Sequence, residues 1–312
     1  MIFVNKTRAG LLAAACASAL ALSACGQNDG ASNTGTSGSS ASASAAPSQQ
    51  AIEKYNAYTD GYNELIGTFG AAYQYDRYQR LNIPAAAASA DLNFPANVTL
   101  FERAIGKIKQ GRAVNGGNGA AAADAAADKV IASGEALIAK WKELEPYYQS
   151  KAYRDDALAK GKAAHTEIVA AYEGLLAGID ELDTVLTEQA RAQNAQRIAD
   201  LRKSGEDNAA NLIDASAQAE ILVSHALADK LPEADAGLAN LEAAIAKARE
   251  TQGKMSDGDI NKSHYDMTLD ALTDVVGAFR NLKQSPSDSN KEAVLRAYNE
   301  SVTAMNRADL PA

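Results

Sequence analysis

The chain has 312 residues, of which 46% are hydrophobic but only 6% aromatic, because alanine supplies much of the apolar content. This composition favours closely packed helices over a sheet, which needs β-branched and aromatic residues to fill its core. The net charge is −9, and charges of both signs are spread along the chain, which argues against a nucleic-acid-binding protein. Nucleic acid is therefore not an expected partner, and composition and charge do not identify an activity.

Residues 1–24 have the pattern of a removable export signal. Two basic residues precede an apolar stretch, residues 11–22, that is too short to span a bilayer but suits the apolar region of a signal peptide. The stretch ends in Leu22-Ser23-Ala24-Cys25, which resembles the lipobox of bacterial lipoproteins. This resemblance implies cleavage between Ala24 and Cys25 and attachment of fatty acids such as palmitate to Cys25. The alternative is an ordinary signal peptide followed by an incidental cysteine.

The residues around Cys25 predict how the mature protein is attached. Several acyl chains on one cysteine would anchor it stably in a membrane. Cys16 is removed with the signal, so Cys25 has no cysteine left with which to form a disulfide. Gly26 stands where Asp favours retention at the cytoplasmic membrane in many Gram-negative species, so that sorting rule implies the outer membrane, facing the periplasm. The outer face of the cytoplasmic membrane is the alternative. Residues 25–48, rich in Gly, Ser and Ala, predict a flexible tether of about 25 Å root-mean-square length.

Residues 49–312 are predicted to form an all-helical domain. Apolar residues recur there at alternating spacings of three and four, the period of helices packed side by side. Four such seams are present: Ile52, Tyr55, Thr59, Tyr62, Ile66, Phe69 and Tyr73; Ala127, Val130, Gly134, Leu137, Trp141, Leu144 and Tyr148; Leu158, Gly161, His165, Ile168, Tyr172, Leu175, Ile179, Leu182 and Leu186; and Tyr265, Leu269, Leu272, Val276 and Phe279. The fold class is therefore all-α.

Turn and cap residues divide this domain into helices. A helix is predicted to start near Val98, another to end at Pro146, and a third to begin around Pro232. The longest is predicted from about Asp155 to beyond Arg202, roughly 70 Å, with a kink or an end at Ser204-Gly205. Such a length predicts an elongated bundle of long antiparallel helices.

Few residues suit catalysis or metal binding. The three histidines, His165, His225 and His264, are not at the spacings of a metal site, and His165 lies on an apolar seam as a core histidine would. Residues 256–268 lack the glycine and the glutamate that an EF-hand calcium loop requires. No cofactor, no metal and no catalytic residue is predicted.

Tyrosines are concentrated near the start of the domain, and three of them, Tyr58, Tyr75 and Tyr78, lie off the first seam. With Arg77 and Arg80 nearby, these rings could stack on a glycan or a protein partner. Packing against a neighbouring helix explains them equally well.

The segment from Tyr147 to His165 is the most distinctive in the chain. It has a tyrosine pair, a short loop, the run Tyr153-Arg154-Asp155-Asp156, and a helix that opens with Lys160-Gly161-Lys162. It resembles the corresponding stretch of the YiiG-like bacterial lipoproteins, the domain-of-unknown-function 3829 family. The resemblance implies an all-helical, membrane-anchored envelope protein and no particular activity. The two aspartates are also typical of a helix start, where carboxylates accept free backbone N–H groups.

Three functions remain open on these grounds. The first is a non-enzymatic, lipid-anchored helical module that binds an envelope partner or serves as a scaffold. The second is a receptor for a small ligand or polysaccharide, with Tyr58, Tyr75 and Tyr78 on its surface. The third is a hydrolase whose carboxylates come from different helices.

Overall fold

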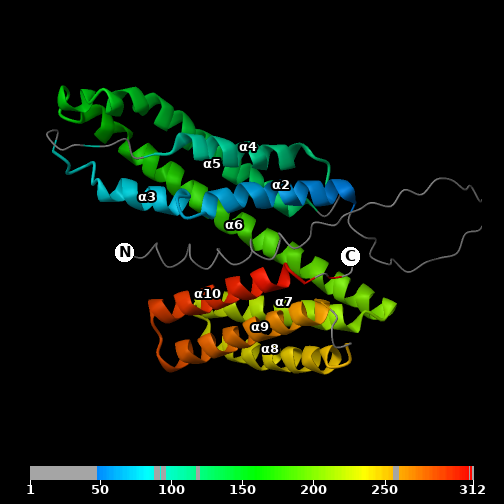
Figure 1. Cartoon of the computed structure of the whole chain (residues 1–312). Helices are drawn as coiled ribbons and strands as arrows, with labels where there is room; N and C mark the ends of the chain where they lie inside the picture. The colour runs from blue at the N-terminus through cyan, green and yellow to red at the C-terminus, as the bar shows by residue number, and fades with distance from the viewer. Residues whose placement is uncertain are drawn as a thin grey trace, which may run out of the picture.

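The computed structural model describes residues 48–87, 92, 96–116, 120–255, 260–308 and 310, and every long element among them is a helix. The all-α prediction is therefore confirmed. The elements, shown in Figure 1, are α2 (Gln49–Ile66), α3 (Ala71–Arg80), α4 (Val98–Ala113), α5 (Ala121–Gln149), the 3₁₀ turn η4 (Ala152–Arg154), α6 (Ala159–Ser204), α7 (Asp207–Leu227), α8 (Leu231–Gln252), α9 (Ile260–Gln284) and α10 (Asp288–Met305).

The long helix α6 organises the fold. It has 46 residues, about 70 Å at 1.5 Å per residue. It begins four residues later than predicted, because Leu158 adopts a left-handed conformation with φ 66°. It ends at Ser204, and the following Gly205 has a φ of 83°, which requires the conformational freedom of glycine. The predicted length and the predicted end at Ser204-Gly205 are both confirmed.

The core is divided along α6 rather than continuous. One cluster of buried apolar residues joins α2, α3, α4 and α5 to the first part of α6, and a second joins α7, α8, α9 and α10. A small cluster between them includes Ile198 and Leu201 of α6 and Ile213 of α7. Figure 1 shows the two helical groups on opposite stretches of α6. The predicted elongated bundle is thus two helical groups on one long helix.

Three of the four predicted seams are buried as expected. All members of the α5 and α9 seams are buried, and the α6 seam is buried except at His165, which is partly exposed. The period of apolar residues therefore identified the inward faces of α5, α6 and α9 correctly.

The first seam is wrong beyond Ile66. The sequence predicts one face continuing through Phe69 and Tyr73, yet their side chains are 63% and 45% exposed. The chain leaves the helix at Gly67 and re-enters it at Ala71, so α3 starts with a new register. The apolar positions of α3 that face inward are consequently Tyr75 and Tyr78.

The other helix boundaries follow local chemistry. Asn97 and Ser287 cap α4 and α10, where their side chains accept hydrogen bonds from backbone N–H groups. Pro232 lies in the first turn of α8 as predicted. Pro146 was predicted to end its helix, but α5 continues to Gln149 with the proline inside its last turn.

Among the described residues, no helix is both long and apolar enough to cross a membrane. Ala24, Cys25 and nearly the whole predicted tether lie outside these residues, as do residues 256–259 of the rejected calcium loop.

Candidate functional site

The three tyrosines predicted for a binding surface lie in the core. Tyr58 and Tyr78 are each 1% exposed and Tyr75 is 4% exposed, so the prediction of a tyrosine-lined surface is wrong. Tyr75 stacks on Tyr172 of α6 with ring centroids 5.1 Å apart, and Tyr78 meets Trp141 of α5 edge to face at 5.4 Å. The reason is that α3 packs against α6 with the face that carries both rings.

Tyr58 is buried for a different reason: α2 is covered on two sides rather than one. Its seam residue Tyr62 donates to Asp183 of α6 at 2.6 Å, while Tyr58 points toward α4 and α5. Tyr58 lies against Gly111 of α4, where a Cβ atom would come within 2.8 Å of the tyrosine ring. The sequence analysis assigned a single apolar face to α2, so it could not predict this second buried face.

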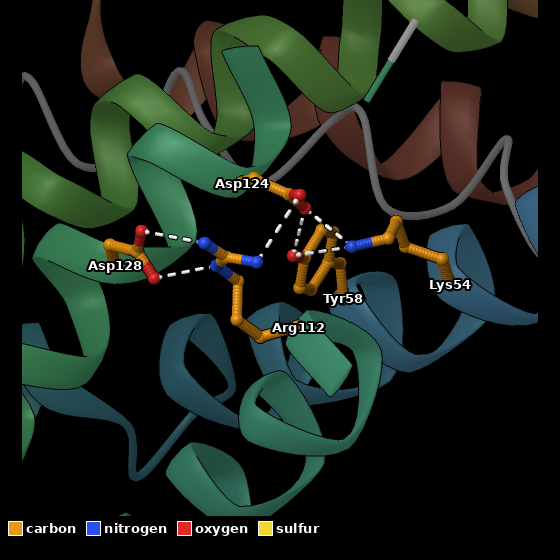
Figure 2. Close-up of polar contacts among 5 residues, drawn as sticks. All are labelled: Lys54, Tyr58, Arg112, Asp124 and Asp128. Carbon is orange, nitrogen blue, oxygen red and sulfur yellow. Dashed lines mark hydrogen bonds and ion pairs between the residues drawn. The ribbon is translucent and has the colours of Figure 1, made fainter. Parts of the chain in front are cut away.

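The second face of α2 carries a cluster of five connected polar residues, shown in Figure 2. One carboxylate oxygen of Asp124, on α5, accepts a hydrogen bond from the Tyr58 hydroxyl at 2.5 Å. The same oxygen forms an ion pair with Lys54, also at 2.5 Å. Lys54 Nζ also lies 3.3 Å from the Tyr58 hydroxyl oxygen. Arg112 of α4 lies 3.4 Å from the other oxygen of Asp124 and pairs with Asp128 at 2.7 Å. We refer to these five residues as the α2–α4–α5 cluster.

The charge states in the cluster follow from its contacts. Burial alone would raise the pKa of Asp124, but hydrogen bonds from Lys54 and Tyr58 and the charges of Lys54 and Arg112 outweigh it and lower that pKa. Burial, followed by the hydrogen bond to Asp124, raises the pKa of Tyr58 well above its ordinary value. Asp124 is therefore an ionised acceptor and Tyr58 a neutral donor at neutral pH.

This arrangement is suited to holding helices together. An ionised carboxylate that already accepts from a lysine, a tyrosine and an arginine is a weak general base, and a phenol with a raised pKa is a weak acid. Lys54 is 3% exposed despite its charge, so its pairing with Asp124 offsets the cost of burial. The cluster fixes α2, α4 and α5 relative to one another.

The pKa of a second carboxyl, that of Asp183 on α6, is shifted in the opposite direction. Burial raises its pKa to about 6, opposed by the hydrogen bond from Tyr62 and reinforced by the nearby charges of Asp180 and Glu220. Glu220 of α7 is itself held by Arg191 through two hydrogen bonds, at 2.9 and 3.0 Å. Asp183 is thus a partly buried group whose protonation changes close to neutral pH.

The raised pKa of Asp183 predicts a specific pH dependence of stability. A carboxyl whose folded pKa lies above its unfolded value of about 4 stabilises the folded state most when protonated. That contribution is lost as pH rises through about 6. Asp183→Asn keeps an acceptor for Tyr62 but cannot ionise. The stability of this variant relative to wild type should therefore increase as pH rises from about 4 to about 6 and then level off, as measured by urea unfolding at each pH. A difference that does not change with pH would contradict the assignment.

The histidines do not converge on a site. Nδ1 of His165 lies 2.8 Å from the Tyr78 hydroxyl oxygen, so this histidine is hydrogen-bonded as expected, but it is partly exposed rather than fully in the core. His225 and His264 lie on α7 and α9. Within the described part of the chain, no group of three or more His, Cys, Asp or Glu side chains is placed to hold a metal ion.

The distinctive segment from Tyr147 to His165 forms the corner between α5 and α6. Tyr147 donates to Asp156 at 2.8 Å, and the other oxygen of Asp156 accepts from the Lys160 backbone N–H at 3.0 Å. The Lys160 bond first, and then the Tyr147 bond, lower the pKa of Asp156. The Tyr153 hydroxyl accepts from the backbone N–H of Leu92 at 3.1 Å. The expected capping role is therefore confirmed for Asp156, and the segment acts as a structural corner.

Lys54, Arg112, Asp124 and Asp183 were not recognised from the sequence. Lys54 and Tyr58 are four residues apart and so share a helix face, which was the only local signal. Their partner Asp124 lies 70 residues from Lys54 along the chain, inside an alanine-rich run that gives no hint of a polar contact.

Comparison with known proteins supports the resemblance noted in the sequence. The family model described as a protein of unknown function, DUF3829, matches residues 49–307. No curated protein and no solved structure gives a significant match. The family match covers most of the chain and all of its described helices, from α2 to α10. The chain therefore belongs to the DUF3829 family of unknown function.

Proposed function

We propose that this protein is a lipid-anchored cell-envelope protein whose helical part works as a non-enzymatic binding or scaffold module. The observation that carries the proposal is the sequence Leu22-Ser23-Ala24-Cys25 at the end of an export signal. Lipid on Cys25 would fix the chain to a membrane, and Gly26 favours the outer membrane, facing the periplasm. The outer face of the cytoplasmic membrane is the other possible location.

The arrangement of the helices supports a scaffold. Two helical groups with separate buried clusters are attached to one continuous helix, α6, which spaces them along its length. In the α2–α4–α5 cluster, polar side chains buried between helices contact one another. The flexible tether between the anchor and α2 would let these groups stand clear of the membrane surface. An envelope protein or a glycan is the expected partner, and crosslinking in intact cells followed by mass spectrometry would identify it.

The anchor is tested by Cys25→Ser. The variant lacks the thiol that accepts the lipid, so it should remain an unprocessed precursor and take up no palmitate analogue. Metabolic labelling, followed by separation of the outer and cytoplasmic membranes, measures attachment and location together.

Cys16→Ser is the matched control, because Cys16 lies within the signal. This variant should be processed and labelled like wild type. Equal labelling of Cys25→Ser and wild type would end the lipoprotein proposal.

A further inference from the structure

The connection between α4 and α5 places an asparagine directly before a glycine. Asn115-Gly116 opens the run Asn115-Gly116-Gly117-Asn118-Gly119, which holds the only two Asn-Gly pairs in the sequence. Asn115 and Gly116 are described by the structure and lie outside the helices, whereas Asn118 is not among the described residues. Asn115 is exposed and Gly116 is partly exposed, so solvent reaches the first pair.

An asparagine before a glycine can lose its side-chain amide by reacting with its own backbone. The backbone nitrogen of the next residue gives up its proton to solvent and attacks the side-chain carbonyl carbon, Cγ. The new N–C bond closes a succinimide ring, and the amide nitrogen leaves as ammonia. Water then opens the ring at either carbonyl and yields aspartate or isoaspartate. Glycine favours the ring closure, because it has no side chain to crowd the nitrogen and leaves the backbone free to rotate.

The local structure suits this reaction at Asn115. Helix α4 ends at Ala113, and the N–H of Val114 donates to the Gly111 carbonyl at 3.2 Å. Within the described part of the chain, no backbone carbonyl is placed to accept a hydrogen bond from the Gly116 N–H. This N–H can therefore lose its proton to solvent, which is the first requirement of the attack.

Asn306 is an internal comparison, because it is also exposed and also lies just after a helix, α10. The next residue there is Arg307, whose side chain crowds the backbone nitrogen. The Arg307 N–H also donates to the Ala304 carbonyl at 3.0 Å. Asn306 thus has the exposure of Asn115 but is not followed by an uncrowded nitrogen.

The pair lies against the α2–α4–α5 cluster. A Cβ atom at Gly116 would come within 2.6 Å of Lys54 Cδ, so the Gly116 backbone packs on the stem of the buried lysine. A carboxylate at position 115 would stand beyond the C-terminal end of α4, where the helix dipole disfavours negative charge. Isoaspartate would also lengthen the backbone directly before Gly116. We propose that Asn115-Gly116 is a site of deamidation through a succinimide, and that its products loosen the packing of Gly116 on Lys54.

This inference is independent of the proposed anchor at Cys25. The test ages the full-length protein at physiological temperature and pH, with Asn118→Gln introduced so that one Asn-Gly pair remains. Glutamine reacts far more slowly, because it must close a larger ring. Tryptic cleavage after Arg112 and Lys129 releases one peptide that contains Asn115. Its mass, followed over time and compared with a digest at time zero, reports the exchange of the amide for a carboxyl group.

We expect Asn115 to deamidate roughly tenfold faster than Asn306 in the same sample, equivalent to about 1.4 kcal/mol in the barrier. The rate should rise with pH, because the attacking nitrogen must lose its proton. Asn115→Gln in the same background is the matched control and should abolish the mass change of the peptide. Circular dichroism of each variant checks that the helices are retained.

The reactivity of Lys54 gives a separate readout of the effect on the cluster. The Lys54 side chain is 4% exposed, so brief acetylation should modify it slowly in fresh protein. Labelling of Lys54 should increase severalfold in the aged protein and stay unchanged in Asn115→Gln aged in parallel. Deamidation of Asn115 no faster than that of Asn306 would overturn the proposal. Rapid deamidation with Lys54 labelling unchanged would overturn the effect on the cluster.

Discussion

Replacing Tyr78 by alanine should lower the free energy of unfolding by about 3–5 kcal/mol, the usual cost of removing a buried aromatic ring. Tyr78 is 1% exposed, meets Trp141 edge to face at 5.4 Å and is hydrogen-bonded to His165 at 2.8 Å. The variant therefore loses apolar contacts and leaves a partly buried imidazole without its partner. Urea unfolding of residues 49–312, followed by circular dichroism and by the fluorescence of Trp141, measures the loss.

Tyr73→Ala is the matched control on the same helix. Tyr73 is 45% exposed, so its loss should change the free energy of unfolding by no more than about 0.5 kcal/mol. Tyr78→Phe removes only the hydroxyl and should cost about 1 kcal/mol. A larger effect of Tyr73→Ala than of Tyr78→Ala would mean that α3 continues the register of α2, as the sequence alone suggested.

The local fold was largely predictable because helix periodicity and caps are local properties. The spacing of Leu175, Ile179 and Leu182 fixes the buried face of α6, and Ser287 and Pro232 mark helix starts. The failure at Phe69 and Tyr73 has a local cause too. Gly67 and Gly70 flank the residues where the helix breaks, but the apolar spacing across them still fits one continuous helix.

The arrangement of helices could not be predicted in the same way. Periodicity says which face of a helix is buried but not which helix covers it, so neither the split core nor the second buried face of α2 was visible. The α2–α4–α5 cluster depends on that second face. Lys54 looks like a solvated lysine until α4 and α5 are placed over it, and Asp124 looks like one acid in an alanine-rich helix.

Asp183 illustrates the same limit for electrostatics. Its raised pKa arises first from burial against α2 and then from the proximity of Asp180 and Glu220. Asp180 is close in sequence, but burial and Glu220 come from helices that only the tertiary structure brings near. Acidic residues with unusual pKa values are therefore found from packing rather than from spacing.

Removing the carboxylate of Asp124 should have the other large effect on stability. Asp124→Ala leaves Lys54 buried and without its ion pair, and it leaves the Tyr58 hydroxyl without its acceptor. Breaking a buried ion pair from one side costs about 3–5 kcal/mol, and we expect the lower end, about 3 kcal/mol, because Asp124 is itself partly exposed. Asp128→Ala is the matched control. Its pair with Arg112 is exposed, so it should cost no more than about 1 kcal/mol.

The pH dependence of Asp124→Ala distinguishes loss of the ion pair from loss of packing. The folded pKa of Asp124 is lowered, so its contribution is complete above the unfolded value of about 4 and is lost as pH falls through the folded pKa. The difference between wild type and Asp124→Ala should thus be constant from about pH 5 to pH 8 and shrink below about pH 4. A double variant, Lys54→Met with Asp124→Leu, should recover much of the loss, because an apolar pair leaves no buried charge. If the double variant is as unstable as Asp124→Ala, or if the difference persists unchanged at low pH, the cost comes from packing and the cluster does not stabilise the helices through its charges.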